Sequence, residues 1–317
     1  MLKSIRLIQL FSGYYEPSHV VAICLILSEI GLSPKLLSVF GNGTIIEYIE
    51  SRHFSANDYL NPKTVTLLAQ KLAKFHSLQM PVPKDSTHYS TTNIFEKWFD
   101  QKLRDSYRTG IIRKHITAQN LEIFSKLDFI EEVEWYQRTV TELRSPIVFS
   151  HNDFNRRNIL IQESDNNNST DNPDIYLIDF DWSNYNYRGV DFGQYFSRWG
   201  QTDTEFGSGD FPADTQMYDF IEAYIQEMTK IYGKSYAQNE INSRERLIKE
   251  SKVLALLAYI KDILYCMDST DSRDNHEMLM KGEIRFRCYY DLKNRILKEY
   301  PKINRISHLI NKFNNKL

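Results

Sequence analysis

The sequence predicts an α+β protein, with a small strand-rich part at its N-terminus followed by a larger, mostly helical part. Two observations lead to this prediction. Short apolar segments separated by turn residues fill positions 1–50, whereas apolar residues recur at helical spacing through most of positions 51–317. Within the second part, two apolar segments of strand length carry a cluster of polar residues. We therefore expect two units, 1–50 and 51–317.

The first unit is expected to contain a strand, a helix and a hairpin. The strand covers 5–11, the helix covers 17–30, and the hairpin strands cover 36–40 and 44–49. Gly31 is expected to end the helix, because glycine commonly follows helix C-termini. The sequence Gly41-Asn42-Gly43 is a strong turn signal for the hairpin.

The second unit opens with a helix start signal. Asn61 is a favourable N-cap residue, and Pro62 suits the first helical position. Further along, apolar residues at helical spacing predict core helices around 217–228 and 254–264.

Composition and charge exclude several classes of function. A net charge of −2 gives no general attraction to nucleic acid, and the longest apolar run, 20–27, is too short to insert into a membrane. The three cysteines are far apart and form no Cys-x-x-Cys pair, which indicates idle thiols in a reducing compartment. We expect a cytoplasmic protein.

The most informative segment places polar residues after two strands. An apolar strand leads into the pattern H-x-D-x-x-x-x-N, formed by His151, Asp153 and Asn158. A second apolar strand leads into Asp179. Phosphoryl transfer from a metal-bound nucleotide needs a carboxylate near the acceptor hydroxyl and oxygen ligands for Mg²⁺. Asp153 suits the first task, and Asn158 and Asp179 suit the second.

The remaining residues of this segment have simpler interpretations. The Asn-rich stretch 163–173 is expected to be an exposed insertion in a hairpin, which would bring the two metal ligands to one end. His151 is expected to be structural and to bind backbone near the second acid. Arg156 and Arg157 are interpreted as surface charge rather than as phosphate ligands.

The continuation of the segment resembles a known family. Residues 179–199 read DFDWSNYNYRGVDFGQYFSRW. This stretch resembles the choline/ethanolamine kinase signature, in which I-D-F-E-aromatic precedes S-x-Y-N-Y-R-G-x-D-x-G. Residues 71–80 (KLAKFHSLQM) also fall in family order. The resemblance covers residues 20–295 and implies a two-lobed fold like that of protein kinases and aminoglycoside phosphotransferases.

The resemblance also implies an activity. The γ-phosphate of ATP would be transferred, with Mg²⁺, to the hydroxyl of choline or ethanolamine, the first step of phosphatidylcholine or phosphatidylethanolamine synthesis. By position, Asp153 would be the base, and Asn158 and Asp179 would hold Mg²⁺. Backbone groups of Glu47 and Ile49 would bind adenine. The expected partner is a small amino alcohol, and a homodimer is compatible with the resemblance.

Further positions match the substrate pocket of the family. The candidate substrate-binding residues are Asn155, Asp181, Trp182, Arg198, Asp262, Tyr265 and Tyr289. Faces of aromatic rings attract a quaternary ammonium through their quadrupole, which explains the tryptophan and the tyrosines. For the two tyrosines, packing on helix faces is an equally good interpretation. Asn155 stands where the family has Gln, so its amide has less reach.

The sequence departs from the family in three ways. Nothing before Ser4 supplies the Gly-rich hairpin over the phosphates, which implies an incomplete nucleotide-binding lobe. Arg198 replaces an acid, and it would repel an ammonium at about 4 Å by roughly 4 kcal/mol at an effective dielectric of about 20. Asp262 replaces an expected tryptophan, and its carboxylate would neutralise Arg198 or bind a primary ammonium.

Three functions therefore stay open at this point. The first is an active choline or ethanolamine kinase, with the acidic replacements favouring ethanolamine. The second is a kinase for another small alcohol, in which Arg198 anchors a carboxylate or phosphate. The third is a catalytically impaired relative or a truncated gene product.

Overall fold

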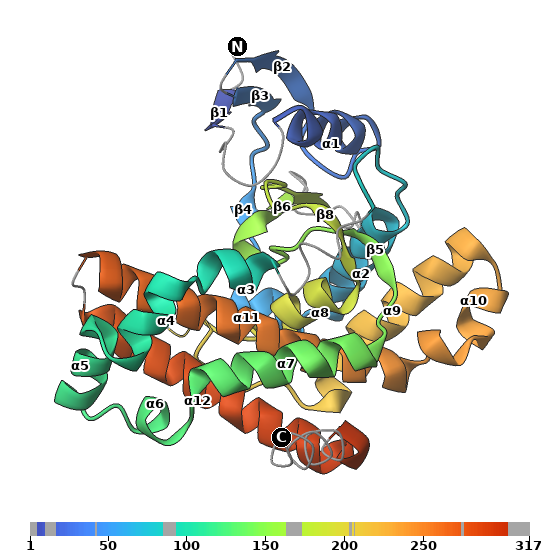
Figure 1. Cartoon of the computed structure of the whole chain (residues 1–317). Helices are drawn as coiled ribbons and strands as arrows, with labels where there is room; N and C mark the ends of the chain where they lie inside the picture. Colours follow the sequence, from blue (N-terminus) through green and yellow to red (C-terminus); the bar gives the residue numbers. More distant parts are fainter. Residues whose placement is uncertain are drawn as a thin grey trace.

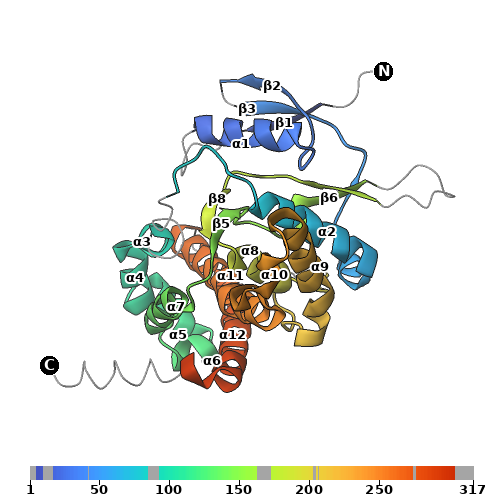
Figure 2. The same ribbon diagram turned by 90° about the vertical axis from the view of Figure 1, so that its right-hand side faces the viewer.

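The computed structural model describes residues 5–9, 17–41, 43–84, 93–162, 173–202, 205, 207–273 and 276–303. Figure 1 shows two parts of unequal size, a small one with strands and a helix near the N-terminus and a larger one rich in helices. Figure 2, turned by 90°, shows the small part lying across one end of the larger part. The expected α+β fold with two lobes is thereby confirmed.

The small part is an antiparallel sheet with a helix beside it. Its strands, in the order β1-β3-β2, are β1 (Ile5–Gln9), β2 (Leu36–Phe40) and β3 (Gly43–Glu47). Helix α1 (Pro17–Glu29) buries Ile23 and Leu27. It ends before Gly31, whose φ of 69° lies in the left-handed region that favours glycine. The strand, the helix and the hairpin are as expected, although Asn42 of the turn lies outside the described residues.

Two further antiparallel sheets carry the polar segment. The first, in the order β4-β6-β7, contains β4 (Arg52–His53), β6 (Ile159–Gln162) and β7 (Asp174–Leu177). The second pairs β5 (Ile147–Ser150) with β8 (Asn184–Tyr187). Ile159 lies opposite Leu177, so the chain entering β6 and the chain leaving β7 are neighbours. The expected hairpin is present, but its Asn-rich stretch 163–172 lies outside the described residues.

Helices make up most of the larger part. They and the 3₁₀ turns are η1 (Ala56–Leu60), α2 (Pro62–His76), α3 (Asn93–Trp98), α4 (Gln101–Arg108), α5 (Ile111–Ala118), α6 (Glu122–Lys126), α7 (Phe129–Leu143), η3 (Arg156–Asn158), α8 (Gly189–Phe196), α9 (Asp214–Tyr232), α10 (Ser235–Gln238), η4 (Glu240–Asn242), α11 (Arg244–Arg273) and α12 (His276–Glu299). As expected, Asn61 caps α2, because its Oδ1 accepts the N–H of Lys63 at 3.1 Å.

Helix α11 is the central element of the larger part. It packs against α7, α8, α9 and α12, and residues 251–260 are all buried. Figure 2 shows it running between these neighbours. The core helices expected around 217–228 and 254–264 correspond to α9 and α11, and both contribute to the core. Within the described ranges, no helix has the length and apolar character needed to cross a membrane.

Candidate active site

Asp191 of α8 holds the loop that follows β5. Its carboxylate is 0% exposed and accepts the backbone N–H of His151 at 2.7 Å and that of Asn152 at 2.8 Å. Asn152 has a φ of 63°, in the left-handed region that Asn tolerates better than most residues. Two hydrogen bonds to a charged acceptor therefore fix the backbone directly before Asp153.

His76 of α2 supports Asp191 from the far side. Its Nε2 lies 2.9 Å from Asp191 Oδ2, and its Nδ1 lies 3.0 Å from the hydroxyl of Tyr224. The neutral imidazole satisfies both contacts when Nε2–H donates to the carboxylate and Nδ1 accepts from the tyrosine. Burial lowers the pKa of His76, although its hydrogen bond to Asp191 acts in the opposite direction.

His151 connects the loop to the second acid of the motif. Its buried ring donates from Nε2 to the backbone oxygen of Ile178 at 3.0 Å. Ile178 in turn donates its N–H to the backbone oxygen of Asn158 at 3.0 Å. Asp179 follows with a φ of 67°, a conformation that commonly marks functional sites. The expectation that His151 binds backbone near the second acid is confirmed.

Asp153 and Asn158 are in direct contact. The Nδ2 of Asn158 donates to Asp153 Oδ2 at 2.7 Å and to the backbone oxygen of Asp153 at 3.0 Å. Both hydrogen bonds use the amide nitrogen, so the amide oxygen is left on the other side of the side chain. The contact therefore orients the carboxylate and presents an oxygen that suits a hard cation.

Asn158 and Asp179 fit the needs of Mg²⁺. This ion commonly takes one or two protein carboxylates and completes its shell with water and substrate phosphates. No three His, Cys, Asp or Glu side chains of the described residues are grouped so that they could hold a metal ion. Two oxygen ligands from the protein match an ion that takes the rest of its shell from water and a nucleotide.

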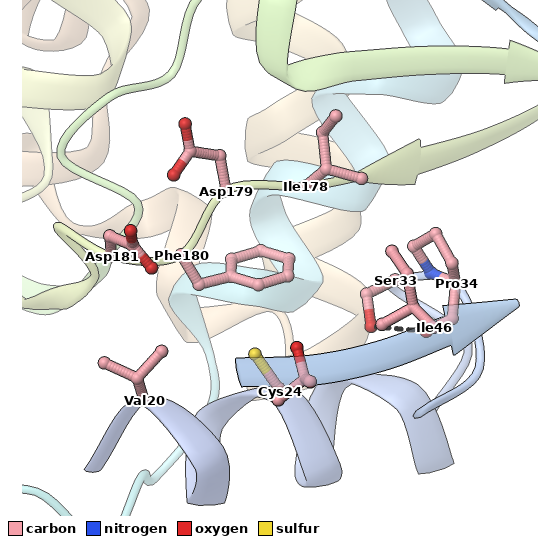
Figure 3. A pocket seen from close by; sticks show the side chains of 10 residues that line it. Val20, Cys24, Ser33, Pro34, Ile46, Ile178, Asp179, Phe180 and Asp181 are labelled. Atoms are coloured by element: carbon pink, nitrogen blue, oxygen red, sulfur yellow. Dashed lines mark hydrogen bonds between the residues drawn. The ribbon is translucent and has the colours of Figure 1, made fainter. Parts of the chain in front are cut away.

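A small cavity lies between the small part and this loop. Figure 3 shows its two sides. One side is formed by residues of α1, β3 and the turn between α1 and β2, and the other by 178–181. The lining residues are Val20, Cys24, Ser33, Pro34, Thr44, Ile46, Ile178, Asp179, Phe180 and Asp181. The lining is mostly apolar, and Asp179 and Asp181 add two carboxylates to it.

Two groups of this cavity have shifted pKa values. Burial, followed by the charge of Asp179, raises the pKa of Asp181 to about 6. Burial, followed by the charge of Asp181, raises the pKa of the Cys24 thiol to about 12. The thiol is therefore neutral near pH 7, and Cys24 acts as an apolar wall rather than as a reactive group.

Glu47 and Ile49 follow Ile46, which lines this cavity, but are not themselves among its lining residues. Glu47 ends β3, where its N–H donates to the backbone oxygen of Lys35 at 2.7 Å. The backbone oxygen of Ile49 accepts the hydroxyl of Ser51 at 3.0 Å. The adenine contacts assigned to Glu47 and Ile49 stay a prediction.

Trp182 forms an aromatic pair with Trp98 of α3. The ring centroids are 5.4 Å apart and the planes are nearly perpendicular, at 83°. The backbone oxygen of Trp182 accepts from Asn152 Nδ2 at 2.9 Å, which places the pair beside the loop of Asp153. The ammonium nitrogen of Lys261 lies 5.5 Å from the Trp98 ring and 5.4 Å from the Trp182 ring.

Arg198 is buried and paired with an acid. Its Nη2 lies 2.6 Å from Asp262 Oδ2, and the Nε of Arg285 lies 3.4 Å from the same oxygen. Gly207 leaves room for both guanidinium groups, because a Cβ there would lie 2.9 Å from Arg198 Nη1 and 3.0 Å from Arg285 Nε. Of the two roles expected for Asp262, the structure shows the neutralisation of Arg198.

Comparison with known proteins decides the family. A family model described as choline/ethanolamine kinase matches residues 9–290. The chain belongs to the choline/ethanolamine kinase family. Choline/ethanolamine kinase from Homo sapiens is 28% identical over 280 residues, which are 86% of this chain and 67% of the human protein. Choline kinase alpha from Mus musculus is 27% identical over 279 residues, which are 86% of this chain and 60% of the mouse protein.

Solved structures of an ethanolamine kinase and a choline kinase share the fold of this chain. An ethanolamine kinase from Plasmodium vivax matches with a TM-score of 0.65 and 20% identity, covering 90% of this chain and 74% of that one. A choline kinase from Cryptosporidium parvum matches with a TM-score of 0.61 and 19% identity, covering 93% of this chain and 90% of that one. At these identities the likeness shows the fold alone.

The local environments of three further candidate substrate residues are also defined. Asn155 caps η3, because its Oδ1 accepts the N–H of Arg157 at 3.0 Å. Tyr289 is buried in the core of α12 and donates to Glu132 Oε2 at 2.9 Å. Tyr265 of α11 is 61% exposed. Tyr289 therefore packs on a helix face, and the substrate roles of Asn155, Tyr265 and Tyr289 stay predictions.

One expectation about charge is wrong. Arg156 is 3% exposed, so it is not surface charge. It lies in η3, which turns it inward. Burial raises the pKa of the Tyr59 hydroxyl, and the charge of Arg156 partly opposes this rise. Arg157 is exposed, as expected.

Trp98 and Lys261 lie next to Trp182, but neither belongs to a sequence motif, so the sequence analysis did not select them. Trp98 stands in a short helix without a clear apolar period. Lys261 gave a stronger signal, because it interrupts an otherwise apolar stretch of α11, and lysine is rarely placed among buried residues without a partner.

Proposed function

We propose that this chain transfers the γ-phosphoryl group of ATP to the hydroxyl of a small amino alcohol, ethanolamine or choline, with Mg²⁺ on the nucleotide. The observation that carries the proposal is the contact of Asp153 with Asn158, on a loop that Asp191 fixes close to Asp179. Membership of the choline/ethanolamine kinase family supports the same class of reaction.

Asp153 is the group that acts on the acceptor. Its carboxylate orients the hydroxyl and takes its proton as the new O–P bond forms. Asn158 steadies this carboxylate through Oδ2, which leaves Oδ1 to face the hydroxyl. Asn158 and Asp179 would hold Mg²⁺, which supplies positive charge to the phosphates when it is bound.

The two units have separate roles in this proposal. Residues 1–50 bind the nucleotide, with adenine in the apolar cavity and backbone groups of Glu47 and Ile49 as its partners. Residues 51–317 carry the catalytic and acceptor groups. The reaction takes place in the cytoplasm, as the first step of phosphatidylethanolamine or phosphatidylcholine synthesis. The free thiols of Cys24, Cys266 and Cys288 agree with a reducing compartment.

Asp153→Asn tests the proposal. With ATP, Mg²⁺ and either alcohol, the substitution should lower kcat at least about 100-fold, because general-base catalysis contributes about 10²–10⁴-fold. Nucleotide binding should change little. The measurement is phosphorylated product by mass spectrometry together with ADP release.

Asp100→Asn is the matched control for this experiment. Asp100 caps α4 by accepting the N–H of Leu103 at 2.8 Å, and Asn is an equally good cap. This variant should retain wild-type turnover. Background-level product from wild type and Asp153→Asn alike, on both alcohols, would contradict the proposed function.

A further inference from the structure

We propose that Lys261 is a specificity-determining residue, whose own amine fills the cation position at Trp98 and Trp182 and selects against acceptors with a trimethylammonium group. The favoured acceptors are then alcohols with a primary amine. This inference rests on the proposed function, because it concerns the acceptor of that reaction.

The geometry supports this assignment. The Nζ of Lys261 is nearly equidistant from the two rings, at 5.5 and 5.4 Å from their centroids, within the range of cation–π attraction. It also donates to the backbone oxygen of Asn152 at 3.4 Å. Asn152 directly precedes Asp153, so the amine lies beside the loop that carries the proposed base.

Whether Lys261 is charged or neutral, it favours acceptors with a primary amine over acceptors with a trimethylammonium group. Burial lowers its pKa, whereas the charges of Asp153, Asp262 and Asp191 raise it and that of Arg198 lowers it. A charged Lys261 competes with any cation for the ring faces and repels it. A neutral Lys261 still covers the rings, and its lone pair accepts a hydrogen bond from a primary ammonium but not from a trimethylammonium group.

A primary ammonium has partners at this site that do not depend on the rings. It carries N–H donors that can share the backbone oxygen of Asn152, which also accepts from Gln194 Nε2 at 2.7 Å. They can also share the carboxylate of Asp262, which pairs with Arg198 and Arg285 and whose side chain is 31% exposed. A trimethylammonium group has no N–H donor, and aromatic faces are its main source of affinity. Loss of the ring faces therefore weakens choline more than ethanolamine.

The test compares acceptor preference in three proteins. Lys261→Met removes the amine and keeps an unbranched side chain, and Lys261→Arg keeps a cation. We expect Lys261→Met to raise the ratio of kcat/KM for choline to that for ethanolamine at least tenfold, and Lys261→Arg to stay within threefold of wild type. A ratio in Lys261→Met within twofold of wild type would overturn the inference. Lys261→Gln replaces the methionine variant if that one does not fold.

Lys293→Met is the matched control. Lys293 also lies on a tryptophan, 4.2 Å from the ring centroid of Trp135, and it pairs with Glu132. Its substitution removes a lysine–tryptophan contact of the same kind between α7 and α12. The choline to ethanolamine ratio should stay at the wild-type value.

A binding measurement separates this inference from the proposed function. Choline is titrated into each protein without nucleotide, by calorimetry and tryptophan fluorescence. Lys261→Met should bind choline at least tenfold more tightly than wild type, and unchanged binding would overturn the role of Lys261. If neither alcohol is phosphorylated by any variant, the proposed function fails, while the titration still decides what Lys261 does.

Discussion

His76 ties the catalytic loop to the helical core through one buried carboxylate. It contacts Asp191, and Asp191 holds the loop by two backbone N–H groups. A second proton on the imidazole would face the hydroxyl of Tyr224 and the repulsion of the Arg188 charge. The protonation of His76 is therefore coupled to the stability of the fold.

We expect the free energy of unfolding to fall as the pH drops below about 6.5, the ordinary pKa of histidine. The pKa of His76 is lower in the folded chain than in the unfolded chain, so the unfolded chain binds the proton first. Its contribution is complete above about 6.5 and is lost as the pH falls toward the folded-state pKa. Denaturant titrations across this range measure the effect.

His76→Gln should remove the part of the pH dependence of the free energy of unfolding that comes from His76. The free energy of unfolding itself should be lower than in wild type. His53→Gln is the control, because His53 is an exposed histidine in β4, away from Asp191 and Tyr224. Retention of the full wild-type slope in His76→Gln would show that another group is responsible.

The residues of the catalytic loop were predictable because they are close in sequence. His151, Asp153 and Asn158 form one local pattern, and the bond from His151 to Ile178 follows from it. Lys261 stands out in its helix, but its placement between Trp98 and Trp182 was not predictable. These three residues come from distant segments, and only the packing of α3 and α11 around the loop brings them together.

At the scale of elements, Gly193 sets the separation of α8 and α11. A Cβ at Gly193 would lie 2.4 Å from the nitrogen of Ala255 and 2.6 Å from the carbonyl carbon of Leu254, both in the backbone of α11. Asp191 belongs to the same short helix. The position of its carboxylate therefore depends on this close approach.

Gly193→Ala should destabilise the fold and lower turnover together. Overpacking of this kind costs typically about 1–3 kcal/mol, which exceeds the gain of up to about 1 kcal/mol from the better helix propensity of alanine. Thermal unfolding and kcat are the measurements. Gly41→Ala is the control, since no atom lies within 4 Å of its added Cβ. An unfolding temperature at or above that of wild type would refute this account of the helix contact.

Helices with a long apolar period or a clear terminus signal were predictable, and short ones were not. Asn61 and Gly31 mark boundaries by side-chain and backbone chemistry that acts locally. Helices α3 to α6 contain between 5 and 8 residues each, which is little more than one or two turns. Over so short a length, the spacing of apolar residues in a helix cannot be distinguished from that in other structures.

At the scale of the whole molecule, the cavity between the two parts is built from both. Cys24 enters it from α1, and Phe180 and Asp181 enter it from the larger part (Figure 3). The sequence predicted two parts, but the placement of one against the other depends on tertiary packing. A larger side chain at this boundary should affect nucleotide binding.

Cys24→Phe should weaken nucleotide binding at least tenfold, because the larger ring fills space that the base requires. Leu25→Phe is the control, since Leu25 is the next residue of α1 and is 49% exposed. Titration with a fluorescent ATP analogue gives the affinities, and circular dichroism checks the fold. Equal affinity in the two variants would place the nucleotide elsewhere.

Helix α11 combines a rigid core with residues at the acceptor. Positions 251–260 are buried among other helices, whereas Lys261 and Asp262 follow at the point where the helix reaches the aromatic pair and Arg198. The side chain at position 261 can change while the backbone that carries it stays fixed, whereas Asp262 is needed to neutralise the buried Arg198. One codon, that of Lys261, should therefore suffice for laboratory evolution of new acceptor preferences, with most library members still folded.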